Sequence, residues 1–469
     1  MSPKRTEPQG GAAKVAHVDF DVGFVHAALI LALTAGFGSA VVLGLQLGFD
    51  LPANRWWPVL VQIHGHAQVF GWLGLFIIGV SLHFIPRFAG AALPAPSLAR
   101  WIWILLSFAV VGRCGQLVLS AAVAAEVRLW GRWILAASGA ADILAVALYA
   151  LLLGWVLRAG DPRRQAIRPL RPYFLSALCG WLVAGAVIGV QTVRAAALDL
   201  VLVDPEWQHF GLDLFVGLVL IPIAFAFSIR TFPLYLRLPA VRWPVQRLAA
   251  IYLFAFGLEM APVLAVLLGW TEWWQIYLQP VGKIVKGAAI VFFVWRLDLL
   301  RRRPPWTVER EGERSAQARL HAKPRAHLPD YGEFGHFEWL IYAAYAWLVV
   351  AGGLEVFSGI ALLSGAFAPC APGVLRHVYL AGYATLLLLG MAPRMIPGFL
   401  HIRRLAFPGL VDASFWLGSA AILFRLLPLL LPQGMAGPLA YLFGLSGLLG
   451  WLAVVALAVN LWATLYRRA

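Results

Sequence analysis

The sequence predicts an all-α polytopic membrane protein with twelve transmembrane helices, arranged as three pseudo-repeated four-helix units. The 469 residues are 61% hydrophobic and only 13% charged, which is far from the composition of a soluble globular domain. Twelve apolar runs are each long enough for a membrane crossing, which takes about 20 residues. A shared pattern recurs in the second, sixth and tenth runs, and this spacing of four predicts the three units.

The twelve expected helices follow one another with short polar loops between most of them. Their approximate limits are 22–46, 58–86, 101–123, 131–157, 173–197, 209–232, 245–269, 275–297, 338–364, 374–398, 411–431 and 437–465. Residues 1–21 form a polar cytoplasmic tail that leads directly into the first helix, so no cleavable signal peptide is expected. Residues 22–297 carry helices one to eight and residues 338–469 carry the last four. Between them, residues 298–337 form a charged cytoplasmic linker that is too short and too charged for a folded domain.

Basic residues set the expected orientation. Lysine and arginine are concentrated in the N-terminal tail, in alternate loops and at the C-terminal end, whereas the intervening loops hold few of them. Because positive residues mark the cytoplasmic side, both termini are expected in the cytoplasm. The net charge of +15 is therefore a topology signal, and no basic groove with interleaved aromatic residues predicts a nucleic-acid partner.

Each of the three repeated runs begins with a ligand-type residue, carries a basic side chain 17 positions later and a proline 20 positions later. These residues are His66, His83 and Pro86 in the first copy, Asp213, Arg230 and Pro233 in the second, and His377, Arg394 and Pro397 in the third. Polar side chains at matched depths in a bilayer are costly and point to function. We interpret the pattern as a buried metal or haem site. Arg230 and Arg394 either pair with a haem propionate or extend to the lipid headgroups.

Seven of the histidines fall into two layers across the expected membrane. The outer layer holds His64, His66, His209 and His377, and the cytoplasmic layer holds His26, His83 and His401. His83 lies 17 residues after His66, which corresponds to roughly 25 Å along a helix. The two layers predict two sites, the second of which pairs His83 with His26 or His401.

The spacing of the outer residues predicts how they are grouped. His64 and His66 project about 200° apart on a regular helix, so both cannot bind one metal ion there. We therefore expect His66 and His377 in one centre and His64 and His209 in an adjacent one. Asp213 shares a helix face with His209, and a carboxylate commonly orients a metal-bound imidazole.

The cofactor expected at these histidines is a non-covalently bound haem b, in one or two copies. The sequence has no C-x-x-C-H motif, which excludes covalent c-type attachment. Histidine is then the obvious axial ligand. Eight further charged residues fall inside apolar runs: Arg113, Asp142, Arg194, Glu259, Lys283, Lys286, Glu355 and Arg425. Of these, Glu259, Glu355 and the two lysines either line a proton route or pair with one another.

Two segments carry a resemblance to known families. HGHAQVFGWLGLFIIGVSLHFIPRF, from His64 to Phe88, resembles the haem-binding second span of haem-copper oxidases and nitric oxide reductases. The run 245–269 has no histidine, however, and the tenth run lacks their His-x-His, so their copper centre is not expected. The closer resemblance is to the NnrS family, carried by HGHAQVFGWLG and by RHVYLAGYATLLLLGMAPRMIPGFL, from Arg376 to Leu400. It departs at Phe399, where a histidine is expected, with His401 two residues later.

The NnrS resemblance implies a haem protein, with copper as a further metal, that acts in nitric oxide metabolism or resistance to nitrosative stress. It implies haem or metal positions at His64, His66 and His377, and a location in the bacterial inner membrane. Whether the protein is an oxidoreductase acting on nitric oxide is left open. One alternative is a redox enzyme related to haem-copper oxidases that receives electrons from a quinol or another redox partner. The other is a twelve-helix transporter without haem, whose substrate cavity would lie near the bilayer midplane.

Overall fold

The computed structural model describes residues 19–52, 54–161, 166–236, 238, 240–300, 333–365, 372–430 and 437–467. All regular secondary structure in these ranges is helical. Twelve of the described helical segments are long and apolar enough to cross a membrane. This confirms the prediction of an all-α, multi-pass membrane protein. The N-terminal tail up to residue 18 and most of the charged linker lie outside the described residues.

Each expected apolar run corresponds to one candidate span. The first four spans consist of α1 (Gly23–Leu31), η1 (Ala32–Gly36) and α2 (Phe37–Gly48); α3 (Trp57–His66), η2 (Ala67–Gly74) and α4 (Leu75–Ala89); α5 (Pro96–Gly112) and α6 (Gly115–Ala121); and α7 (Ala125–Ala159). The next four consist of α8 (Arg171–Ala197); α9 (Pro205–Leu214), η3 (Phe215–Leu220) and α10 (Ile221–Tyr235); α11 (Val245–Leu267); and α12 (Gln275–Leu297). The last four consist of α14 (Phe337–Leu363); α15 (Pro372–His377), η5 (Val378–Thr385) and α16 (Leu386–Phe399); α17 (Gly409–Leu430); and α19 (Ala440–Tyr466), which follows the short η6 (Gly437–Leu439).

The fourth span begins at Ala125, six residues before the expected start at 131. Arg128, in this extra turn and a half, and Arg132, one residue past the expected start, contact residues at and just after the end of α8. Arg128 pairs with Asp199 at 2.7 Å, and Arg132 donates to the carbonyl of Ala196 at 2.9 Å. These tertiary contacts extend the helix beyond the apolar run, which hydropathy alone does not reveal.

The second, sixth and tenth spans share a local irregularity. Each contains a π-helical segment that starts one or two residues after the ligand-type residue: η2 after His66, η3 after Asp213 and η5 after His377. Short π-helical segments within α-helices occur frequently at functional sites. The three segments lie at matching positions along their spans.

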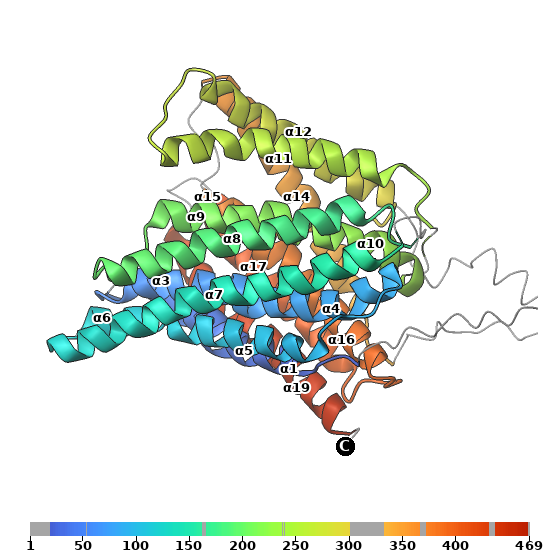
Figure 1. Cartoon of the computed structure of the whole chain (residues 1–469), viewed down its shortest axis with the longest axis horizontal. Coiled ribbons are helices and arrows are strands. Elements are labelled where there is room, and N and C mark those ends of the chain that lie inside the picture. Colours follow the sequence, from blue (N-terminus) through green and yellow to red (C-terminus); the bar gives the residue numbers. More distant parts are fainter. Residues whose placement is uncertain are drawn as a thin grey trace, which may run out of the picture.

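These three spans lie in the interior of the helix bundle. In their most apolar stretches, 83%, 78% and 61% of the residues are buried; among the other candidate spans the fifth also reaches 61%, and the rest range from 28% to 50%. Figure 1 shows α3, α9 and α15 toward one end of the bundle and α4, α10 and α16 toward the other. The three central spans therefore run in the same direction, and their ligand-type residues share one end, called the outer end below.

At the opposite end the three central spans contact one another in a cycle. Each contributes an imidazole or guanidinium that packs on the aromatic ring two residues past the proline of another span. His83 stacks on Phe399 at 4.3 Å between ring centroids, Arg230 lies 5.9 Å from the Phe88 centroid, and Arg394 lies 4.7 Å from the Tyr235 centroid. The second span thus contacts the tenth, the sixth contacts the second, and the tenth contacts the sixth.

Candidate functional site

A cavity of about 290 Å³ lies at the outer end of the bundle, and we call it the outer cavity. Its lining comes from the first, second, sixth, tenth, eleventh and twelfth spans. The polar side chains in this lining include His64, Gln68, Gln208, His209, Arg376, His377 and Arg425. Much of the remaining lining is small, including Gly65, Gly418, Gly447 and Gly450. The volume is just below the range of about 300–1,000 Å³ that is usual for small-molecule sites.

His64 lines the outer cavity from the last turn of α3. Its Nδ1 lies 3.0 Å from the carbonyl oxygen of Gly36, at the end of η1. A carbonyl can only accept, so Nδ1 carries the proton and Nε2 carries a lone pair. Metal-binding histidines usually donate their second N–H to such an acceptor, which fixes the ring and raises its basicity. The local geometry of His64 therefore leaves Nε2 as the nitrogen that can accept a hydrogen bond or coordinate a metal.

His377 has the same arrangement in the last turn of α15. Its Nδ1 donates to the carbonyl oxygen of Gly373 at 2.6 Å, one helical turn earlier. Its Nε2 lies 3.3 Å from a terminal nitrogen of Arg425 on α17. Arginine only donates hydrogen bonds, so Nε2 must accept and the imidazole is neutral. The two histidines thus both keep Nε2 as the nitrogen with a lone pair, on the wall of one cavity.

Asp213 has a different partner from the one expected. Its two carboxylate oxygens accept from Nε and a terminal nitrogen of Arg376, at 2.8 and 2.9 Å. This two-bond geometry matches the planar guanidinium to the carboxylate, and it links the sixth span to the tenth. Asp213 therefore neutralises Arg376 and does not orient His209, which is exposed at the rim of the cavity.

Arg425 lines the cavity, although the sequence placed it only among the charged residues inside apolar runs and assigned it to no site. Its guanidinium carbon lies 4.1 Å from the centroid of the Phe443 ring. In the part of the chain that the structure describes, no carboxylate lies within 4 Å of it. A cation inside a membrane span normally has such a partner or a function. The signal in the sequence was a lone arginine in the apolar run 411–431, but nothing there indicated what it faces.

His66 is turned away from the outer cavity. Its Nε2 lies 2.9 Å from a carboxylate oxygen of Asp142 on α7, and the two side chains are only 1% and 0% exposed. The ring also stacks on Phe70 at 4.9 Å between centroids. His64 and His66 do face different surroundings, as their two-residue spacing predicts. The grouping is different from the expected one, however, because His377 shares the cavity with His64 and His209 and not with His66.

The three histidines of the cytoplasmic layer lie in three different environments. His83 is buried between the rings of Phe20 and Phe399. His26 accepts a hydrogen bond through Nδ1 from the indole N–H of Trp462 at 3.0 Å. His401 is exposed in the turn after α16, where its φ is +59°. The described residues also contain no group of three His, Cys, Asp or Glu side chains that could hold a metal ion, so the copper expectation has no ready ligand set there.

Glu259, Lys283, Lys286 and Glu355 form a closed ring of ion pairs, called the charged quartet below. Lys283 lies 2.9 Å from Glu259 and 3.2 Å from Glu355, and Lys286 lies 2.5 Å from each of the same two carboxylates. The hydroxyl of Tyr379 on η5 donates to Glu355 at 3.3 Å. Of the two interpretations drawn from the sequence, the geometry matches mutual ion pairing. The quartet joins α11, α12 and α14 and carries no net charge.

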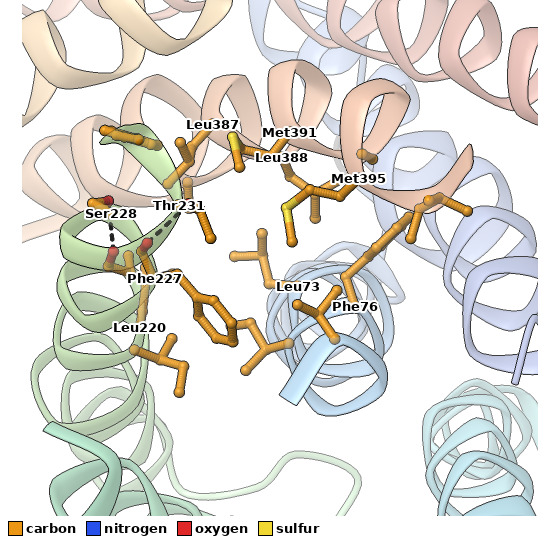
Figure 2. Close-up of a pocket in the computed structure, with 18 residues that line it drawn as sticks. Leu73, Phe76, Leu220, Phe227, Ser228, Thr231, Leu387, Leu388, Met391 and Met395 are labelled. Atoms are coloured by element: carbon orange, nitrogen blue, oxygen red, sulfur yellow. Dashed lines mark hydrogen bonds between the residues drawn. The ribbon is translucent and has the colours of Figure 1, made fainter. Parts of the chain in front are cut away.

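A second cavity of about 120 Å³ lies between the three central spans, and Figure 2 shows its lining. Leu73 of η2, Phe227 of α10 and Met391 of α16 each contribute to its wall. The two hydroxyls in the lining donate to their own helix: Ser228 to the carbonyl of Ala224 at 2.6 Å and Thr231 to that of Phe227 at 2.8 Å. The cavity thus has an apolar surface, and Leu73 also lines the outer cavity.

Neither a protein-family profile nor a curated protein matches the chain in sequence comparisons. The resemblance to the NnrS family therefore remains a prediction that rests on the two segments quoted above. The geometry of the outer cavity provides a separate line of argument for the function.

Proposed function

We propose that this protein binds haem b in the outer cavity through His64 and His377 and acts in nitric oxide metabolism or in resistance to nitrosative stress. The main observation in support of haem binding is that the two imidazoles on the wall of this cavity have the same protonation pattern. In both, Nδ1 donates to a backbone carbonyl, and Nε2 is left as the coordinating nitrogen. When bound, haem iron supplies a centre for nitric oxide binding or for electron transfer, and the polarity of its pocket decides between them.

The fit of the cavity to haem depends on its shape and charge. The largely apolar lining suits the faces of a flat macrocycle. Because the cavity of about 290 Å³ lies just below the usual range for small-molecule sites, we expect a side chain in its wall to move when the macrocycle enters. Arg425, which has no carboxylate within 4 Å among the described residues, supplies positive charge for a propionate. The nitric oxide assignment rests on the NnrS resemblance alone.

The same proposal includes the architecture and orientation expected from the sequence. Three observations favour three related four-helix units: the matching π segments, the parallel central spans and the cyclic contacts at their far end. The distribution of basic residues favours both termini in the cytoplasm, and the NnrS resemblance implies the bacterial inner membrane. This orientation is tested by introducing single cysteines into successive loops and treating intact cells with a thiol reagent that does not cross the membrane. Only cysteines in the loops on the outer side should then be labelled.

Reconstitution with haem followed by absorption spectroscopy tests the cofactor. Purified protein supplied with haem is expected to give a Soret band and sharp bands on reduction, and a pyridine haemochrome assay should identify haem b. His64→Ala and His377→Ala should each change the spectrum or lower the haem content. His209→Ala is the matched control, because this imidazole lines the same cavity but is exposed at its rim. Folded protein that takes up no haem would refute the proposal and leave the transporter as the alternative.

A further inference from the structure

The coordinating nitrogen of His377 is occupied by another side chain of the protein. Nε2 of this ring accepts from Arg425 at 3.3 Å. A single lone pair cannot accept this hydrogen bond and bind a metal at the same time. The His64 ring differs, because within the described part of the chain its only hydrogen bond is the one from Nδ1 to Gly36. In this state His64 is ready to coordinate and His377 is blocked.

The two arginines of the outer cavity also differ in charge compensation. Arg376 is neutralised by the two-bond contact with Asp213. The described partners of Arg425 are the neutral His377 ring and the face of Phe443. A guanidinium forms its strongest contacts with carboxylates, in two parallel charge-assisted hydrogen bonds. Arg425 is therefore the cation in this cavity that gains most from an incoming anionic group.

We infer that Arg425 is a gate on His377 that opens only for a ligand carrying an anionic group. A carboxylate on the ligand draws the guanidinium away from Nε2, and His377 then coordinates the metal that the same ligand carries. The cavity thus selects metal–ligand complexes with carboxylate substituents over uncharged analogues of the same shape. This inference rests on the proposed haem site, and it assigns to Arg425 a specificity-determining role at that site.

The movement of Arg425 also meets the space requirement of the cavity. The side chain lines the cavity from α17 and reaches His377 on α15, so it occupies part of the cavity next to this ring. Its second described contact is a cation–π contact with Phe443, which is weaker than an ion pair with a carboxylate. Release of Arg425 from the His377 ring therefore frees both the nitrogen and part of the volume.

The test compares haem with its dimethyl ester, which has the same ring and iron but no free carboxylates. Both are added to the purified wild-type protein and to Arg425→Gln, and absorption and electron paramagnetic resonance spectra report the number of axial ligands. In the wild type we expect six-coordinate iron with haem and five-coordinate iron with the ester. We also expect the ester to bind about tenfold to hundredfold more weakly, the range for loss of a hydrogen bond to a charged group.

The variants separate the gate from the haem site itself. In Arg425→Gln both compounds should give six-coordinate iron with similar affinity, because His377 is no longer blocked by a cation. His377→Ala should give five-coordinate iron with both compounds, and it identifies the sixth ligand. If the wild-type protein binds haem and the ester with equal affinity and the same number of axial ligands, the proposed role of Arg425 is refuted, while haem binding itself still holds. Binding of neither compound to folded wild-type protein would instead overturn the proposed function.

Discussion

Replacing Glu355 by glutamine is expected to destabilise the packing of α11, α12 and α14 strongly. The Glu355 side chain is 1% exposed and accepts from Lys283 at 3.2 Å, from Lys286 at 2.5 Å and from Tyr379 at 3.3 Å. The substitution keeps the shape but leaves two ammonium groups with one carboxylate, that of Glu259. Breaking a buried ion pair in this way costs about 3–5 kcal/mol, whereas an ordinary interhelical hydrogen bond in a membrane contributes about 0.6 kcal/mol.

A double-mutant cycle turns this estimate into a test. Lys286→Met alone should cost a similar amount, because it leaves an excess carboxylate near Lys283. The double variant Glu355→Gln, Lys286→Met restores neutrality, so its loss should be smaller than the sum of the single losses by about 0.5–3 kcal/mol. The assay is equilibrium unfolding in mixed micelles, followed by tryptophan fluorescence. Single losses near 0.6 kcal/mol that add without coupling would refute the view that charge balance stabilises the quartet.

Two further predictions concern helix packing. Gly48→Ala should lower the free energy of unfolding by about 1–3 kcal/mol in the same assay, because its added Cβ would overlap the backbone of α19. Gly154→Ala is the control and should be neutral or slightly stabilising, because there is open space around Gly154. Equal effects of the two substitutions would contradict this prediction. Arg394→Met should lower the free energy of unfolding by about 0.5–2 kcal/mol, because its guanidinium packs on the Tyr235 ring at 4.7 Å. Arg230→Met should lower it less, because this side chain is exposed and its guanidinium carbon lies 5.9 Å from the centroid of the Phe88 ring. The reverse order of the two losses would show that the cycle of contacts is not what these arginines stabilise.

Hydrophobicity determined the helical architecture largely by itself. A membrane core satisfies no backbone hydrogen bonds, so long apolar runs must form helices, and each expected run corresponds to one span. The main difference is the early start of α7, where Arg128 pairs with Asp199 just past the end of α8. Such contacts leave no trace in a hydropathy pattern, because they depend on which loop lies beside the helix end.

The candidate site was only partly predictable from the sequence. The spacing of His64 and His66 fixed that the two rings face different directions, because helix geometry is local. It could not assign the partners: His66 pairs with Asp142 from the fourth span, and Arg376 pairs with Asp213 from the sixth. Arg425 faces His377 only because the eleventh span packs beside the tenth. These contacts join residues far apart in the chain, and no local pattern encodes them.

The sequence alone determined the membrane character, the twelve helices and the positions of the residue types that can bind a metal, because hydrophobicity and helical periodicity act locally along the chain. The tertiary structure decided which of these residues share a cavity, which are neutralised and which cation is left without a carboxylate in the described residues. These properties follow from side-chain contacts between spans, and a charge or a lone pair gains its chemical role only from the groups that surround it.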